Sequence, residues 1–311
     1  MFKKSMFASA CALALLASFG CSQEPKVEAV TLEMPEEASE MKSLKAPEVV
    51  FDAERLLSAV QGRSDEDKVR DNARNPLQTL EFFKVAPGMS VAEALPGGGW
   101  YSKVLASYLG SEGQLHGINY NDDMWARFGF FSEDGIAAAI KRTSAFPGMV
   151  SEFNDKGPTP TGFTFSSAPE ELAGTVDRVL FIRALHNLSR FETEAGTMTQ
   201  ALATAKMLLK DGGLVGVVQH QAPEVNDDKW ADGSAGYLKK SAVITAFNNA
   251  GFELLGESSI HENAKDMPTE DDIVWRLPPS YNGTAEDPKL KSAVDAIGES
   301  SRMTLLFKKV Q

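Results

Sequence analysis

This 311-residue sequence predicts an α/β fold in which a doubly wound, mainly parallel sheet carries helices on both faces. Short apolar runs alternate with longer amphipathic segments, as expected when buried strands alternate with the helices that cover them. The clearest unit runs from Met89 to Tyr120, where a strand, a glycine-rich turn, a helix and a second strand follow one another. Such a βαβ unit joins two parallel strands.

The remaining elements follow from local signals. Ser64, followed by Asp65-Glu66-Asp67, and Asn75, followed by Pro76, are predicted helix starts because they combine a capping residue with acidic residues or proline. Apolar runs predict strands over 89–95, 114–120, 161–165, 176–182 and 214–218, from 252 onward, and over 303–308. Helices are predicted over 100–109, 133–145, 197–209 and 241–250, the last two ending at glycines.

The N-terminus predicts an exported protein. Lys3 and Lys4 precede an apolar stretch over 6–19 that is too short to anchor in a bilayer, and Gly20-Cys21 closes it. Residues 1–20 therefore read as a signal peptide, and the sequence resembles a lipoprotein signal with Cys21 as the lipidated residue. The alternative is an ordinary cleaved signal with an incidental cysteine. Residues 21–50 are polar and read as a flexible tether, which leaves 51–311 as the folded domain.

The net charge and the cysteine content exclude several classes of function. The net charge is −12, and it becomes −14 when residues 1–20 and their two lysines are removed. Nucleic acid is therefore not expected as the main partner, because a phosphate-binding face needs excess Lys and Arg. The only cysteines are Cys11, inside the signal, and Cys21, so the mature chain has neither an internal disulfide nor a catalytic thiol.

The turn Pro96-Gly97-Gly98-Gly99 is the first candidate binding site. Glycines let a ligand approach the backbone closely, and the following helix presents free N–H groups. In a doubly wound sheet such a turn lies where a nucleotide-type cofactor binds. The dinucleotide fingerprint fits poorly because Ser102 stands where its third glycine or alanine belongs. The alternative is a tight turn that only packs the helix on the strand.

Glu93, followed by this turn, resembles motif I of the class I S-adenosylmethionine (SAM)-dependent methyltransferases, which have a Rossmann-like fold. The resemblance implies that Glu93 lies near the methionine moiety of SAM and that Pro96, Gly97, Gly98 and Gly99 lie under the cofactor. The string from Pro96 to Tyr101 is similar to a subgroup of predicted, often exported, bacterial methyltransferases. Further similar segments are Arg70-Asp71 with Arg74 and Pro76, Asp177 through His186-Asn187, Leu209 to Gly213, and Ile297 to Phe307.

One position departs from this pattern. Asn119 ends the second strand where methyltransferases usually carry a carboxylate for the ribose hydroxyls, and Tyr120 follows it. An amide can accept one hydrogen bond and donate one, so weaker cofactor binding is expected. Asp122 is a possible substitute, and Ser301 stands where the subgroup often has an acid.

Polar residues at the strand ends supply the other site candidates. His186, after the fourth strand, is the predicted catalytic base or acceptor contact, with Asn187, His220 and Tyr101 as substrate contacts. The alternatives are a loop histidine bonded to a backbone carbonyl and aromatic packing. His116 reads as structural. His261 and Asp266 could join His186 and His220 around a metal, but their spacing matches no metal motif, so no metal is predicted.

We therefore expect a SAM-dependent methyltransferase that acts on an unknown small or envelope-associated acceptor, meets the membrane only through its lipid anchor, and has no predictable oligomeric state. SAM is made in the cytoplasm, whereas the signal exports the domain. A non-catalytic SAM- or nucleotide-binding protein of the same fold is therefore the alternative. A nucleotide-dependent oxidoreductase is a third reading, which the poor dinucleotide fingerprint disfavours.

Overall fold

A computed structural model describes residues 50–310, which all belong to one unit of the chain, Pro47–Gln311. The predicted signal peptide, Cys21 and almost all of the predicted tether lie outside the described residues. Within them, the strands are β1 (Ser90–Ala94), β2 (Gln114–Asn119), β3 (Thr159–Thr164), β4 (Val176–Ile182), β5 (Leu209–Ala222), β6 (Leu238–Lys239), β7 (Phe252–Ser258) and β8 (Arg302–Lys309). No helix in residues 50–310 is both long and apolar enough to cross a membrane.

The strands form one sheet in the order β3-β2-β1-β4-β5-β8-β7, with β6 paired beside the end of β5. β1 to β5 run parallel to one another, and β8 runs antiparallel to both of its neighbours, β5 and β7. The order β3-β2-β1-β4-β5 is that of a Rossmann sheet, so the predicted doubly wound, mainly parallel fold is confirmed.

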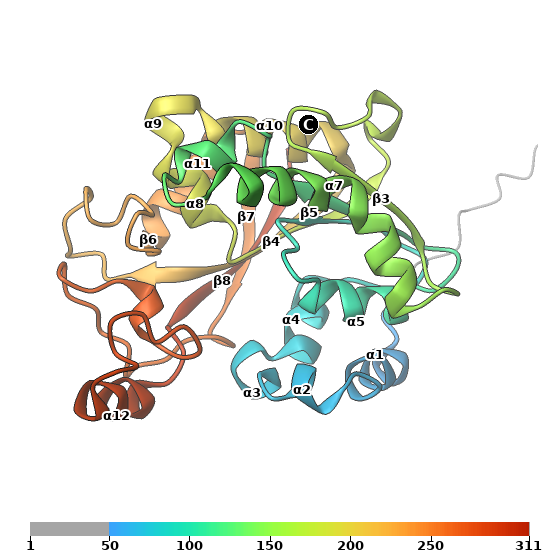
Figure 1. Ribbon diagram of the computed structural model, residues 1–311. Coiled ribbons are helices and arrows are strands. Elements are labelled where there is room, and N and C mark those ends of the chain that lie inside the picture. Colours follow the sequence, from blue (N-terminus) through green and yellow to red (C-terminus); the bar gives the residue numbers. More distant parts are fainter. Residues whose placement is uncertain (1–49, 311) are drawn as a thin grey trace, which may run out of the picture. The chain divides into compact units, whose positions relative to one another are not determined.

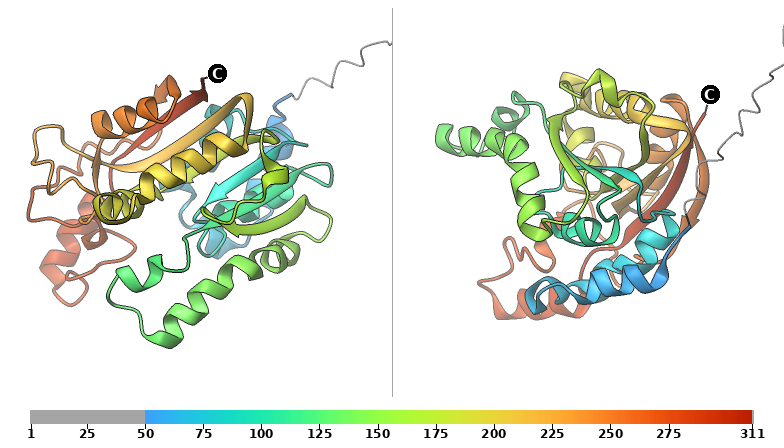
Figure 2. Two further views of the ribbon diagram at one scale, coloured as in Figure 1. Left: turned by 90° about the horizontal axis from the view of Figure 1, so that it is seen from above. Right: turned by 90° about the vertical axis from the view of Figure 1, so that its right-hand side faces the viewer.

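Helices cover both faces of this sheet (Figure 1). In Figure 1, α1, α4 and α5 lie below the strands while α10 and α11 lie above them, and Figure 2 shows the same layers from two further directions. The longer helices are α1 (Ala53–Gln61), α4 (Pro76–Phe82), α5 (Trp100–Tyr108), α7 (Glu133–Phe153), α10 (Thr197–Leu208), α11 (Lys240–Asn249) and α12 (Pro288–Ile297). The shorter ones are α2 (Asp65–Lys68), α3 (Asp71–Arg74), α6 (Met124–Arg127), α8 (Leu185–Arg190) and α9 (Glu192–Ala195).

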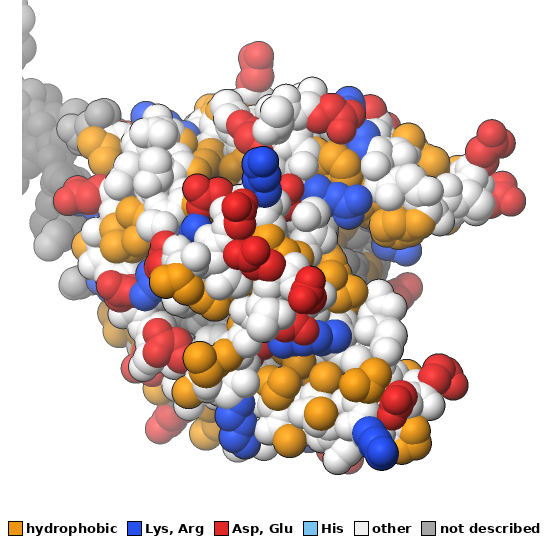
Figure 3. Space-filling view, turned by 90° about the vertical axis from the view of Figure 1, so that its left-hand side faces the viewer, with side chains coloured by type: hydrophobic (Ala, Val, Ile, Leu, Met, Phe, Trp, Pro, Cys, Tyr) orange, Lys and Arg blue, Asp and Glu red, His pale blue; other side chains and the backbone are white. Residues whose placement is uncertain are grey.

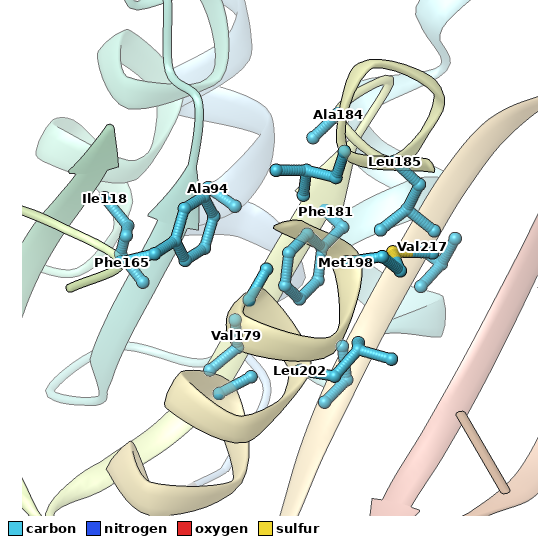
Figure 4. Packing of buried hydrophobic residues seen from close by; sticks show 14 of the residues in the cluster. Ala94, Ile118, Phe165, Val179, Phe181, Ala184, Leu185, Met198, Leu202 and Val217 are labelled. Carbon is cyan, nitrogen blue, oxygen red and sulfur yellow. The ribbon is translucent and has the colours of Figure 1, made fainter. Parts of the chain in front are cut away.

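Each face of the sheet has its own hydrophobic core, because successive strand residues point to opposite faces. Figure 4 shows the core on the α10 side, where Phe181 of β4 and Val217 of β5 face Leu202 of α10. On the other face, Val91 of β1 and Leu180 of β4 pack in a second cluster with residues of α1, α4 and α5. The central strands are thus buried on both sides, which fixes the positions of the loops that follow them.

Most predicted elements are present, and several differ in their bounds or in their capping. Ser64 caps α2 as predicted, by accepting a hydrogen bond from the Asp67 N–H. Asn75 precedes α4, but its side chain bonds to the Ile260 carbonyl instead of capping the helix. The helix predicted over 133–145 continues to Phe153 with Pro147 inside it. The strand predicted over 214–218 spans Leu209–Ala222.

Among the longer helices, two had no counterpart in the prediction. α1 begins after Asp52, whose carboxylate accepts from the Arg55 N–H. α12 begins after Asp287, whose carboxylate accepts from the N–H groups of Lys289 and Leu290. Pro288 occupies the first position of α12, where its missing N–H costs no hydrogen bond.

Candidate functional site

The candidate site lies at the carboxyl ends of β1 and β4, where the strand order reverses. The chain leaves β1 toward β2 and reaches β4 on the other side of β1, so the two following turns diverge and leave a crevice. In the turn after β1, Leu95 has φ 55° and Gly97 has φ 58°; in the turn after β4, Arg183 has φ 60°. Residues other than glycine rarely adopt this left-handed backbone conformation, and those that do are often found at functional sites.

Two cavities meet at these turns and share Leu95, Pro96, Gly97 and Arg183 as lining residues. The smaller, of about 290 Å³, lies toward β2 and α7. The larger, of about 550 Å³, lies toward β5 and the segments before α5 and after α12. Together they have the size and location of a ligand site that could hold two molecules side by side.

Two residues that line the smaller cavity have buried polar atoms without a partner. Asn119 and Tyr120 line it, and the Asn119 Oδ1 atom accepts from the Tyr120 N–H at 2.9 Å. The buried Nε1 of Trp125 and Oγ1 of Thr143 have no hydrogen-bond partner in the described part of the chain. Unpaired buried polar groups are costly, so a ligand that pairs with them would bind favourably.

The three glycines of the turn have different surroundings. A Cβ added at Gly97 or Gly98 would meet nothing within 4 Å, so the backbone there is open to a ligand. A Cβ on Gly99 would lie 2.8 Å from Phe153 and 3.0 Å from Met149, both on α7. Gly99 lines neither cavity and allows α7 to pack closely, so its predicted place under a cofactor is not supported.

Glu93 and Tyr101 also lie away from both cavities. Glu93 is 4% exposed, and its carboxylate accepts from the Ser102 hydroxyl at 2.6 Å. Burial raises the pKa of Glu93 to about 7, against the opposing effects of Ser102 and Arg74. The Tyr101 hydroxyl donates to the Arg74 carbonyl at 2.8 Å, so Tyr101 holds a wall of the larger cavity instead of lining it.

His186 and His220 both line the larger cavity, and their rings are 5.5 Å apart. His186 lies in the first turn of α8, not in a loop, and its Nδ1 is 3.3 Å from Gln219 Oε1. His220 lies within β5, with Nδ1 2.6 Å from Ser300 Oγ. Burial lowers the pKa of His186 to about 4 and lowers the pKa of His220 well below its usual value, so both rings are neutral near pH 7.

The other polar candidates have separate positions. Asn187 lines the smaller cavity, as the shared Arg183 does. His116 bridges Ser90 and Thr161 inside the sheet, with ring nitrogens 3.0 and 2.6 Å from their hydroxyls. His261 bonds to Thr304 and to the Arg74 carbonyl. Within residues 50–310, no three His, Cys, Asp or Glu side chains come close enough to hold a metal ion.

Sequence reasoning assigned no role to the four arginines that line the larger cavity, Arg70, Arg74, Arg183 and Arg302. Arg70 and Arg74 precede the first strand, whereas Arg302 begins the last one. All four lie in segments that the sequence resemblance had picked out, 70–76, 177–187 and 297–307, and this is the signal that could have indicated them.

No protein-family model and no curated protein matches the chain. Among solved structures, the cyclase SpnF is 15% identical, covers 83% of this chain and 92% of its own, and has a TM-score of 0.47. A SAM-dependent methyltransferase from Aquifex aeolicus is 12% identical, with 84% and 100% covered and a TM-score of 0.45. An arsenic(III) SAM methyltransferase from Chlamydomonas reinhardtii is 14% identical, with 84% and 74% covered and a TM-score of 0.42. Likenesses this distant leave the reaction open, since one fold supports different chemistries.

Proposed function

We propose that the chain is a SAM-dependent methyltransferase that transfers a methyl group to a small or envelope-associated acceptor. The observation that carries the proposal is the pair of adjoining cavities at the turn after β1, where the sequence resembles motif I. A cofactor in the smaller cavity and an acceptor in the larger one would meet at Gly97 and Arg183, which line both.

The residues of the smaller cavity fit such a cofactor. Gly97 leaves the backbone open, and the aromatic side chains of Tyr120 and Trp125 wall the space. The unpaired Trp125 Nε1 can donate to a purine nitrogen, and Asn119 can contact a ribose hydroxyl. When bound, SAM supplies a methyl group already activated by its sulfonium, so the protein mainly has to orient the acceptor.

His186 is the proposed acceptor contact. It lines the larger cavity and is neutral near pH 7, so its free nitrogen can accept a hydrogen bond from an acceptor O–H or N–H. A pKa of about 4 makes it a weak general base, so positioning is the larger part of its proposed role.

The proposed site of action is the cell envelope, with the chain held by a lipid on Cys21. The support is the apolar segment that ends at Gly20-Cys21 and the polar stretch that follows. Mass spectrometry of the protein from membranes is expected to find a diacylated or triacylated Cys21 at the mature N-terminus. Cleavage at another site would refute the lipid anchor.

A SAM- or nucleotide-binding protein without catalysis is the second candidate. Asn119, in place of a carboxylate, and the low pKa of His186 both favour it. It predicts ligand binding with no methyl transfer to any acceptor.

Calorimetric titration of the full chain with SAM, S-adenosylhomocysteine and NAD tests the proposal. SAM and S-adenosylhomocysteine should bind and NAD should not. Gly97→Val should weaken SAM binding at least about tenfold, because Gly97 lines the smaller cavity and its new side chain would enter open space there. Gly174→Val is the matched control, since Gly174 also has a positive φ and open space around it and lines neither cavity. Equal SAM binding by both variants would contradict the assigned site, and transfer from labelled SAM separates the enzyme from the binding protein.

A further inference from the structure

The larger cavity concentrates positive charge in an acidic protein. Arg70, Arg74, Arg183 and Arg302 line it, against two carboxylates, Asp67 and Glu299. Asp67 is bonded at 2.8 Å to Lys103, which lies outside the cavity lining. The excess of arginine contrasts with the net charge of −12 and with the many acidic side chains on the face shown in Figure 3.

Glu299 holds Arg70 and Arg302 in place, but its single negative charge does not neutralise both. It accepts from Arg70 Nε at 2.8 Å and from Arg302, whose Nη1 also donates to the Ala73 carbonyl at 2.9 Å. Burial favours the protonated carboxyl, but Arg70 and Arg302 outweigh it and lower the pKa of Glu299 to about 2. This ion cluster therefore keeps a fixed geometry and a net positive charge at neutral pH.

The other two arginines have no anionic partner. The guanidinium groups of Arg74 and Arg183 make no hydrogen bond or ion pair within residues 50–310. Arg74 is 6% exposed, and its guanidinium lies over the Trp100 ring at 4.3 Å. The buried Nε atoms of Arg74, Arg183 and Arg302 are all unpaired.

This arrangement is costly without a ligand. Burial and neighbouring arginine charges lower the pKa of Arg74 to about 9 and that of Arg183 to about 10. Buried like charges destabilise a fold unless a counter-charge joins them. Guanidinium groups bind phosphate and carboxylate oxygens through paired N–H donors, so an oxyanion is the ligand that this cluster fits.

We infer that the larger cavity binds a phosphate or carboxylate group of the methyl acceptor through Arg74 and Arg183, with Arg70 and Arg302 beside them. The assignment of the anion to a methyl acceptor rests on the proposed function, whereas the oxyanion site itself rests on the arginines alone. His186 lines the same cavity, so a bound anion would place the rest of the acceptor within reach of the shared turn.

Thermal unfolding of the full chain tests the site, with inorganic phosphate as the probe and chloride keeping ionic strength constant. Phosphate at ten times its dissociation constant should raise the wild-type melting temperature by about 3 °C. Arg183→Gln and Arg74→Gln should each weaken that response at least about tenfold in phosphate concentration. Without phosphate, Arg183→Gln should melt no lower than wild type, because it removes an unpaired buried charge.

Arg190→Gln is the matched control. Arg190 lies on α8 close to Arg183 in sequence but lines neither cavity, so this variant should respond to phosphate like wild type. Absence of a phosphate effect on the wild type, or the same effect in all four proteins, would overturn the oxyanion site.

The carboxylate of SAM is a second possible source of the anion. Comparing SAM with 5′-methylthioadenosine, which lacks the aminocarboxyl chain, distinguishes the two. If the acceptor supplies the anion, Arg74→Gln, whose side chain lines only the larger cavity, binds both nucleosides like wild type, and phosphate still stabilises the SAM-bound protein. Loss of SAM affinity alone in this variant, with phosphate competing against SAM, would overturn the acceptor assignment. Arginine-dependent phosphate binding without binding of either nucleoside would support the oxyanion site and overturn the methyl-transfer function.

Discussion

Replacing Glu93 by Gln should make the protein more stable, and increasingly so as pH rises. Glu93 lies within β1 at 4% exposure, and its carboxyl keeps one side-chain hydrogen bond, from Ser102. Burial raises its pKa from 4.5 to about 7, because the ionised form has lost its water. A folded-state pKa above the unfolded value means that the folded state binds the proton more tightly. Stability from this group is therefore complete below pH 4.5 and is lost as pH rises to about 7.

The size of the effect follows from these two values. A rise from 4.5 to about 7 corresponds to about 3 kcal/mol in the free energy of unfolding, most of which is lost between pH 5 and pH 8. Glutamine carries no charge and can still accept from Ser102, so Glu93→Gln removes this pH dependence. Any cost of fitting the amide is independent of pH, so it changes the free energy of unfolding by the same amount at every pH.

Urea unfolding of wild type and Glu93→Gln at pH 5, 6, 7 and 8 measures the difference. The stability advantage of the variant should grow by about 2–3 kcal/mol from pH 5 to pH 8. Glu112→Gln, at an exposed position, is the matched control and should show no such growth. An advantage of Glu93→Gln that stays constant over this range would refute the account of Glu93 as a buried carboxyl that resists ionisation.

Three further predictions concern the cavities and the turn. Asn119→Asp should strengthen SAM binding about fivefold in calorimetry, because a carboxylate accepts from both ribose hydroxyls; unchanged or weaker binding would contradict a ribose at Asn119. The His186 ring should stay neutral from pH 8 down to pH 5, since burial lowers its pKa to about 4. Nitrogen NMR shifts of the ring check this, and a titration near pH 6.5 would show that the ring is solvated. Gly99→Val should lower the melting temperature by several degrees, because its side chain would clash with Phe153 and Met149; an unchanged melting temperature would show that α7 yields there.

The sequence alone was enough to predict the layered sheet. β4 is encoded locally by a run of apolar residues, and the turn from β1 into α5 by three successive glycines. The limits of α7 were not predictable in this way. Pro147 signals a helix end, but packing of Phe146 and Val150 in the core continues the helix past it.

The candidate site, too, was only partly predictable from the sequence. The glycine-rich turn was visible in the sequence, yet only the structure shows that Gly97 and Gly98 are open while Gly99 packs on α7. The segments that hold the arginines stood out in the sequence, but their proximity did not, since Arg70 and Glu299 are 229 positions apart and meet only in the folded chain. Hydrogen bonding and apolar periodicity act over a few residues and can be read from the sequence. Charge clustering and burial depend on which distant segments the sheet brings to one edge, and only the tertiary structure decides that.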